Sequence, residues 1–322
     1  MKKALCIGID SYEHVQDLHG CVNDANAMKA ALERNGDGTL NFDTKILCAT
    51  SEASYITRAK LKDSVEELFS GDSEIALFYY SGHGSYDSLG GYLCTSEVTR
   101  VDEGLSLGDL MGIVFHSRAQ NKVVILDSCH SGFAACSQEM PNFSLLKSGT
   151  TILAACDEEQ YATEKNGQGV FTNLFIEALY GGAMNLLGDV TPGSIYAYID
   201  RSLGGWEQRP LFKANIKSFV SLRKNVPPIS INELRKLVEV FPIPSEEFQL
   251  DATYEHDKHE VDNKEVNKEH EATFSLLQKY ARLGLVVPVG TDHMYYAAIE
   301  SKSCKLTAQG QHYWNLVKKN TI

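Results

Sequence analysis

Two short runs decide the fold of this chain: Phe78-Tyr79-Tyr80-Ser81-Gly82-His83-Gly84 and, further along, Val123-Val124-Ile125-Leu126-Asp127-Ser128-Cys129-His130-Ser131-Gly132. Each is a continuous apolar stretch that ends in a reactive side chain beside glycine, which is typical of a strand buried on both faces of a parallel sheet. If the two strands are neighbours, His83 and Cys129 lie at their carboxyl ends, in the crevice where open α/β sheets place their chemistry. The pattern indicates a cysteine nucleophile with a histidine base.

This chemistry needs these residue types. The thiolate is the attacking species, and an imidazole within about 3 Å can take the thiol proton and pass it to the leaving amine. Glycine beside each residue lets a peptide approach, and the N–H groups of Gly84 and Cys129 are candidates for binding a developing oxyanion. The alternative is structural, with Cys129 a small buried hydrophobe and His83 a hydrogen-bonded turn residue. The occurrence of both at strand ends beside glycine favours the catalytic interpretation.

The motifs around His83 and Cys129 resemble those of the caspase-like peptidases of family C14, in particular the metacaspases and bacterial caspase homologues. Animal caspases carry Gln-Ala-Cys-x-Gly at the nucleophile, whereas Asp127-Ser128 before Cys129 matches the metacaspase form. The resemblance runs from Lys3 to about Arg223 and is supported by the segments Ala4–Asp10, Gly20–Ala25, Ala154–Gln160 and Gly169–Thr172. It implies an α/β fold, with a mostly parallel sheet flanked by helices, and a caspase-like cysteine endopeptidase without a cofactor.

The same resemblance implies a pocket for the cut-site residue, the substrate residue whose carbonyl is attacked. Four metacaspase positions form this pocket, and they are matched here by Cys21, Asp24, Ser81 and Asp127. Two carboxylates and a hydroxyl suit a guanidinium or an ammonium and repel aspartate. Cleavage of protein or peptide substrates after Arg, then Lys, is therefore predicted. Structural roles stay open for Asp24, as a charge at a helix N-terminus, and for Asp127, as a turn residue.

Other residues are implied less directly. Asp157 or Glu158, after the next strand, is a candidate for further negative charge in the cleft. Many metacaspases bind calcium, but this chain offers only Glu97, Asp102 and Glu103, with Cys136 where an acid is expected, so no metal is predicted. The loop after the nucleophile is often cut when caspase-like proteins are activated. Lys147 and Lys165 are candidate processing sites, and a plain surface loop is the alternative for each.

Composition sets the limits. A chain of 322 residues, 43% apolar and 22% charged, is long enough for one α/β domain with an appendage and is ordinary for a soluble protein. Neither a membrane-spanning apolar stretch nor a leader pattern is present, and the eight cysteines form no Cys-x-x-Cys pair, so reduced thiols and a cytoplasmic location are expected. A net charge of −12 argues against nucleic-acid binding and is compatible with cationic substrates.

Strand-like and helix-like segments alternate over residues 1–225, which predicts one domain with a mostly parallel sheet. Besides the two opening runs, strands are expected at 3–10, 44–48, 150–156 and 210–222. Helices are expected at 22–35, 57–69, 105–115, 169–180 and 194–203.

The run Val226-Pro227-Pro228 interrupts this pattern and predicts a second domain over 226–322. Its segment 245–268 is charged and is expected to be a mobile linker or a solvated helix. Helices are expected at 231–241, at 271–283 and from a Thr307 cap to Lys319, with a hairpin over 284–300 turning at Gly290-Thr291-Asp292. These elements resemble part of a winged-helix module, a small α+β unit.

A winged-helix module invites a DNA-binding hypothesis, but acidic residues slightly outnumber basic ones after Val226 and no Lys/Arg stripe lies on one helix. A regulatory protein bound at this module, or autoinhibition by it, is favoured. The leading hypothesis is a regulated zymogen, and the resemblance implies a bacterial defence (antiviral) or cell-death pathway. The alternative is a catalytically restrained scaffold or sensor whose C-terminal module binds a partner protein.

Overall fold

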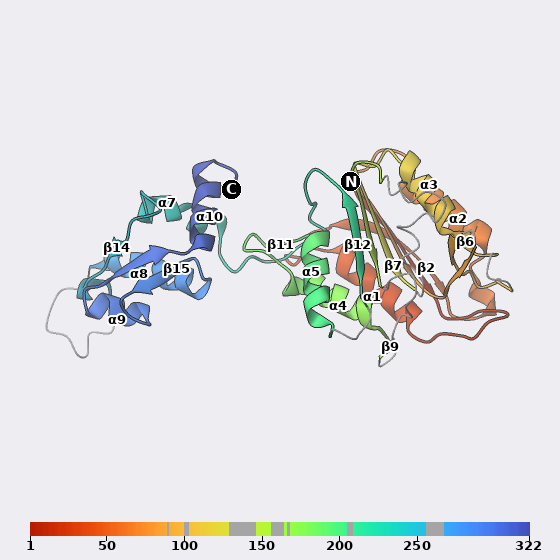
Figure 1. Ribbon diagram of the computed structural model, residues 1–322, viewed down its shortest axis with the longest axis horizontal. Helices are drawn as coiled ribbons and strands as arrows, with labels where there is room; N and C mark the ends of the chain where they lie inside the picture. The colour runs from red at the N-terminus through yellow and green to blue at the C-terminus, as the bar shows by residue number, and fades with distance from the viewer. Residues whose placement is uncertain are drawn as a thin grey trace. The chain divides into compact units, whose positions relative to one another are not determined.

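The computed structural model describes residues 1–88, 90–99, 103–128, 146–155, 164–165, 168–204, 209–255 and 267–322, the side chains of 164, 165 and 168 excepted. The chain divides into two compact units, Met1–Pro227 and Pro228–Ile322 (Figure 1). Each unit is considered by itself below. Within the described residues, no helix combines the length and apolar character needed to cross a bilayer.

The first unit is built on a six-stranded sheet in the order β12-β8-β7-β3-β1-β2. Five strands are parallel, and β12 runs antiparallel to β8 at one edge. The strands are β1 (Lys2–Ile9), β2 (Phe42–Ala49), β3 (Ile75–Ser81), β7 (Asn121–Asp127), β8 (Thr150–Ala154) and β12 (Leu211–Asn215). The prediction of a mostly parallel sheet flanked by helices is confirmed.

Helices cover both faces of this sheet, which explains why the central strands are apolar throughout. Figure 1 shows α1 (Cys21–Glu33), α4 (Val170–Glu177) and α5 (Pro192–Ser202) on one face and α2 (Arg58–Phe69) and α3 (Leu107–His116) on the other. Along β3, Phe78 and Tyr80 pack in the core beneath α2 and α3, while Leu77 and Tyr79 pack beneath α1 and α4. Each large apolar side chain buried in this way contributes about 1.5–3 kcal/mol.

Several predicted boundaries in the first unit are wrong. The expected helix at 105–115 begins only at Leu107, because Leu105–Ser106 forms strand β6 and the Ser106 hydroxyl then caps α3. The expected helix at 169–180 is α4 followed by a π-helical turn, Ala178–Gly182, in which Gly181 has φ 122°. The expected strand at 210–222 stops at Asn215, since its partner β8 begins at Thr150 and offers no further residues to pair with.

Short strands complete the first unit. The chain leaves β3 into a small antiparallel sheet of β4 (Gly84–Asp87), β5 (Gly90–Leu93) and β6. Two further pairs are β9 (Glu164–Lys165) with β10 (Gln168–Gly169), and β11 (Asp189–Val190) with β13 (Arg223–Lys224). The first sheet holds the residues after His83, and β10 leads directly into α4.

The second unit packs helices on a three-stranded antiparallel sheet in the order β14-β16-β15. Phe274, Leu277 and Tyr280 of one helix fill its core, and the indole N–H of Trp314 donates to the carbonyl of Phe241 at 2.7 Å. Its elements are α6 (Ile231–Arg235), α7 (Leu237–Val240), β14 (Phe248–Gln249), α8 (Lys268–Arg282), β15 (Val286–Val289), α9 (Met294–Ile299), β16 (Ser303–Leu306) and α10 (Ala308–Lys318).

The predicted hairpin over 284–300 is wrong in its second arm. The arm is helix α9, with Met294, Ala297 and Ala298 buried at helical spacing, and β15 pairs instead with β16. The apolar residues on this arm fit either period over so short a segment, and packing decides between them. The linker expected at 245–268 is also wrong in its first part, because residues 248–249 form β14; residues 256–266 lie outside the described ones. The winged-helix resemblance stays a prediction.

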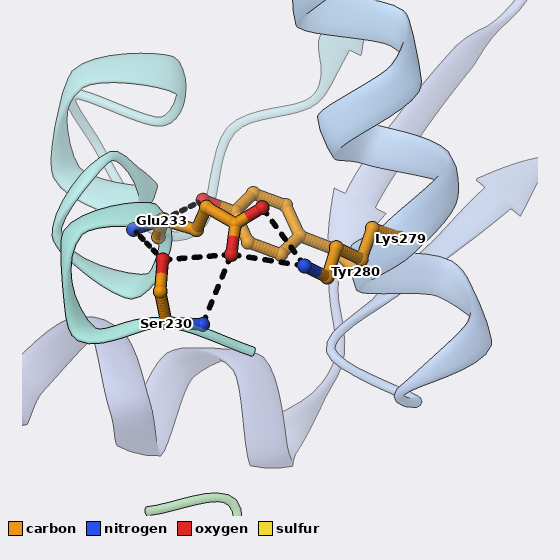
Figure 2. A network of polar contacts seen from close by, with 4 residues as sticks. All are labelled: Ser230, Glu233, Lys279 and Tyr280. Atoms are coloured by element: carbon orange, nitrogen blue, oxygen red, sulfur yellow. Dashed lines mark hydrogen bonds and ion pairs between the residues drawn. The ribbon is translucent and has the colours of Figure 1, made fainter. Parts of the chain in front are cut away.

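One polar network ties α6 to α8 in the second unit (Figure 2). The Glu233 carboxylate accepts from the Ser230 N–H and hydroxyl at 2.9 and 2.7 Å and from Lys279 Nζ at 2.8 and 2.9 Å. The Tyr280 hydroxyl donates to the backbone carbonyl of Glu233. The hydrogen bond from Lys279, followed by those from Ser230, lowers the pKa of Glu233 from 4.5 to about 2.

Glu233→Gln is expected to destabilise the second unit by about 1 kcal/mol at neutral pH. Because the pKa of Glu233 is depressed on folding, this contribution is complete above the ordinary pKa of 4.5 and is lost as the pH falls through about 2. Urea unfolding followed by Trp314 fluorescence measures it, with Trp206, the chain's other tryptophan, replaced by Phe. Glu246→Gln is the control, since that exposed carboxylate makes no bond or ion pair among the described residues. An equal destabilisation at pH 7 and pH 2 would contradict the linkage.

Candidate active site

The two opening runs are neighbouring strands. β3 and β7 pair in parallel with Ser81 opposite Asp127, the last residue of each strand. His83 lies two residues beyond Ser81, at the carboxyl edge of the sheet, and Cys129 is two residues after Asp127 in the sequence. Cys129 itself lies outside the described residues, and the chain is described as far as Ser128, which is buried.

The ring of His83 is held by a backbone carbonyl. Its Nε2 lies 2.7 Å from the carbonyl oxygen of Gln16. Because a carbonyl oxygen only accepts, Nε2 carries the hydrogen, and in the neutral ring the lone pair is on Nδ1. The histidine is therefore oriented with Nδ1 as its basic atom.

Two buried tyrosines hold the backbone of His83 from either side. The His83 N–H donates to the Tyr12 hydroxyl at 2.8 Å. The Tyr80 hydroxyl lies 2.8 Å from the His83 carbonyl oxygen and 2.6 Å from that of Cys94, so its one hydrogen is shared between them. The Tyr12 ring also lies against the imidazole, with 4.7 Å between centroids. A Cβ on Gly82 would lie 2.6 Å from Tyr80 Oη and 2.8 Å from Tyr12 Oη, so only glycine fits between them. Burial raises the pKa of both tyrosines, and both phenols stay neutral.

The loop that supplies Tyr12 and Gln16 is fixed by two carboxylates. Asp17 Oδ1 accepts from the Tyr12 N–H at 2.8 Å. Asp10 Oδ1 accepts from the N–H groups of Cys21 and Val22 at 2.9 and 3.2 Å and thereby caps α1. Burial, which outweighs these hydrogen bonds, raises the pKa of Asp10. The same loop thus positions both His83 and the first turn of α1.

The four residues predicted for the substrate pocket are all buried where α1, β3 and β7 meet. Ser81 Oγ donates to Asp24 Oδ2 at 3.4 Å, and the Gly169 N–H donates to the same oxygen at 3.0 Å. A Cβ on Gly169 would lie 2.4 Å from Asp127 Oδ2 and 3.0 Å from Asp24 Oδ2, so both carboxylates face one point. Cys21 begins α1, one turn before Asp24.

Asp127 is held by α4. Its Oδ2 accepts from the Thr172 hydroxyl at 2.6 Å and from the Thr172 N–H at 3.3 Å. The Tyr79 hydroxyl lies 2.6 Å from Thr172 Oγ1. Burial, followed by the charges of Asp127 and Asp24, raises the pKa of Tyr79 well above 10.

The candidate processing sites and the acidic residues considered for calcium make other contacts. Lys147 donates to the Ser117 carbonyl at 3.0 Å, and Lys165 lies in β9. The Glu97 carboxylate accepts from the Arg58 N–H, and that of Glu103 accepts from Thr99. Across the described ranges no group of three or more His, Cys, Asp or Glu side chains could hold a metal ion. Four other residues singled out from the sequence lie outside the described ones: Asp102, Cys136, Asp157 and Glu158.

The sequence analysis does not predict four groups that contact His83, Asp24 or Asp127. They are the Gln16 carbonyl, the Tyr12 hydroxyl, Gly169 and Thr172. A backbone carbonyl leaves no signature in residue type. The segment Gly169-Val170-Phe171-Thr172 resembles the start of a family helix, and this resemblance is the sequence signal available for Thr172.

The comparisons with known proteins agree with this architecture. The chain matches the family of the caspase domain, peptidase family C14, over residues 1–237, and it belongs to that family. It is 34% identical over 147 residues to Metacaspase-6 of Arabidopsis thaliana, covering 41% of this chain and 38% of the relative. It is 31% identical over 149 residues to Metacaspase-1 of Cryptococcus neoformans, covering 41% of this chain and 32% of the relative. The chain thus spans less than two fifths of the length of these relatives.

Two solved structures share the fold. A protein from Geobacter sulfurreducens superposes with a TM-score of 0.50 at 20% identity, over 70% of this chain and 98% of that one. Caspase-1 from Spodoptera frugiperda superposes with a TM-score of 0.50 at 11% identity, over 70% and 90%.

Proposed function

We propose that this chain is an endopeptidase that cuts proteins after Arg, then Lys, with Cys129 as nucleophile and His83 as general acid and base. The pairing of Ser81 with Asp127 carries the proposal. Ser81 and Asp127 are the last residues of two neighbouring parallel strands. In the sequence, each precedes one member of the proposed dyad by two residues.

The geometry of His83 supports a definite proton path. Nε2 donates to the Gln16 carbonyl, so Nδ1 takes the proton from the Cys129 thiol. The thiolate attacks the carbonyl carbon, and the N–H groups of Gly84 and Cys129 bind the oxyanion. His83 then gives its proton to the leaving amine. Water, deprotonated by the same Nδ1, hydrolyses the thioester and restores the thiol. The Gln16 carbonyl stabilises the imidazolium while it carries the extra charge.

The preference for a basic cut-site residue is supported by the charge of the pocket. Asp24 and Asp127 are 1% and 6% exposed, and both face the region beside Ser81 and Gly169. Two carboxylates at low exposure attract a guanidinium fork, attract an ammonium less well and repel an aspartate. The proposal is tested with fluorogenic peptides that differ only at the cut-site residue. Cleavage after Arg and Lys supports it, and cleavage after Asp, or after no residue, contradicts it.

Tyr12→Phe is expected to lower kcat about tenfold and to leave KM almost unchanged. The variant keeps the ring against His83 but removes the hydroxyl that accepts the His83 N–H, leaving a partly buried donor without its partner. Tyr198→Phe is the matched control, because it also removes one hydroxyl contact, to Glu177 Oε2 at 3.2 Å on α4. Equal kinetics for the two variants, or a change confined to KM, would show that Tyr12 does not position the histidine.

We further propose that the second unit regulates the first by binding a protein partner and that the chain is a zymogen processed at Lys147 or Lys165. The division into two compact units supports this arrangement. Affinity capture with the full chain, compared with a chain that ends at Pro227, tests partner binding by the second unit. Equal partner recovery by both would contradict that binding.

A cytoplasmic location accords with the free thiols of Cys6, Cys48 and Cys304. A role in bacterial defence or cell death rests on the sequence resemblance.

A further inference from the structure

A short hydrogen bond joins Asp127, one of the residues proposed for the pocket, to Thr172 of α4. Thr172 is the third residue of this helix and is fully buried, as is Tyr79 on β3. An ionised Asp127 can only accept, so the Thr172 hydroxyl donates to Asp127 Oδ2 at 2.6 Å. The one hydrogen of Thr172 is then used, so the Tyr79 hydroxyl donates to Thr172 Oγ1 at 2.6 Å. The three side chains form a directed chain of hydrogen bonds that ends on the carboxylate.

The other carboxylate of the pocket is tied to the same turn. The Gly169 N–H, at the N-cap of α4, donates to Asp24 Oδ2 at 3.0 Å. The Thr172 N–H adds a second contact to Asp127 Oδ2 at 3.3 Å. Backbone N–H groups in the first turn of a helix also favour negative charge through the helix dipole. One turn of α4 therefore holds both charges that face the pocket.

We propose that Thr172 is a positioning residue that sets the preference for a basic cut-site residue, with Tyr79 orienting its hydroxyl. The inference rests on the proposed function and deepens it. Thr172 does not touch the substrate: it fixes one oxygen of Asp127 in a single orientation, so that recognition of a cation costs little reorganisation. Without the Thr172 hydroxyl, the Asp127 carboxylate loses a charge-assisted hydrogen bond and its fixed rotamer.

The test compares Thr172→Val, which removes the hydroxyl at nearly constant volume, with Thr172→Ser, which keeps it. The substrates are two peptides that differ only in Arg or citrulline at the cut site, because citrulline keeps the shape of arginine without its charge. Thr172→Val is expected to lower kcat/KM for the Arg peptide about 10- to 100-fold, mostly through KM, and to affect the citrulline peptide much less. Thr172→Ser is expected to stay within about threefold of the wild type, and Tyr79→Phe to fall between the two.

Thr150→Val is the matched control. Thr150 is also buried, at the start of β8, but its hydroxyl has no hydrogen-bond partner among the described residues. Loss of that hydroxyl is expected to leave the ratio of Arg to citrulline cleavage unchanged. Thermal unfolding of the variants shows which of them are folded, and Tyr79→Phe and Thr172→Ser decide the result if Thr172→Val is not.

The outcomes separate the inference from the proposed function. A wild type that cleaves no Arg peptide overturns the function itself. A wild type that does, with Thr172→Val lowering Arg and citrulline cleavage equally, shows a structural role for Thr172 and overturns only the inference. The inference alone is also overturned if Tyr79→Phe leaves the ratio of Arg to citrulline cleavage at the wild-type value while Thr172→Ser lowers that ratio.

Discussion

Cys129→Ala is expected to lower peptide cleavage by at least about 10⁴-fold, to the limit of detection. The methyl group cannot attack a carbonyl. His83→Ala is expected to have an effect of similar size, because the dyad acts as one unit and the thiol then keeps its proton. The measurement is hydrolysis of the Arg peptide by the full chain, with each variant checked for folding.

Cys48→Ala provides the control for this first prediction. Cys48 is a partly exposed thiol on the edge strand β2, and it has no role in the proposed chemistry. Its variant is expected to keep wild-type activity. If Cys129→Ala retained more than about one hundredth of the activity, another nucleophile would have to be sought.

Asp127→Asn is expected to lower kcat/KM for the Arg peptide about 10²- to 10³-fold, with KM carrying most of the loss. The substitution keeps the shape of the side chain, and an amide oxygen can still accept from Thr172, so the variant isolates the charge. Opposite charges that meet at a buried site lose several kcal/mol when one of them is removed. The citrulline peptide is expected to be affected far less, because it carries no charge to pair.

Asp109→Asn separates this local effect from a change in net charge. Asp109 forms an exposed ion pair with Arg58, at 3.6 Å on the surface of α3. Its variant is expected to cleave both peptides as the wild type does. An Asp127→Asn variant with an unchanged preference for Arg over citrulline would remove Asp127 from the pocket.

The sheet was predictable because its evidence is local. The apolar runs that end at Ser81 and Asp127 fix two buried strands, and their common ending fixes the edge where the chemistry is expected. Asp24 and Ser81 are candidates for the pocket only through resemblance, since they come from segments far apart in sequence. The contact from the Gln16 carbonyl could not be predicted, because every residue type has the same backbone carbonyl.

The errors also have a physical pattern. The segment Met294–Ile299 became a helix because its buried face packs on the sheet, and its apolar residues alone fit a strand as well. The strand at Leu211–Asn215 was predicted too long because its length depends on β8, a partner that the local sequence does not specify. In both cases a tertiary contact overrides the local pattern.

Covalent labelling tests the central claim most directly. The full chain is treated with two peptidyl chloromethyl ketones that differ only in Arg or Asp at the cut-site position. A catalytic cysteine thiolate displaces the chloride and forms a thioether. A single adduct is expected, from the Arg reagent alone, mapped by mass spectrometry to Cys129 and lost in His83→Ala. Labelling of Cys129 by the Asp reagent, or an Arg adduct on any other cysteine, would contradict it.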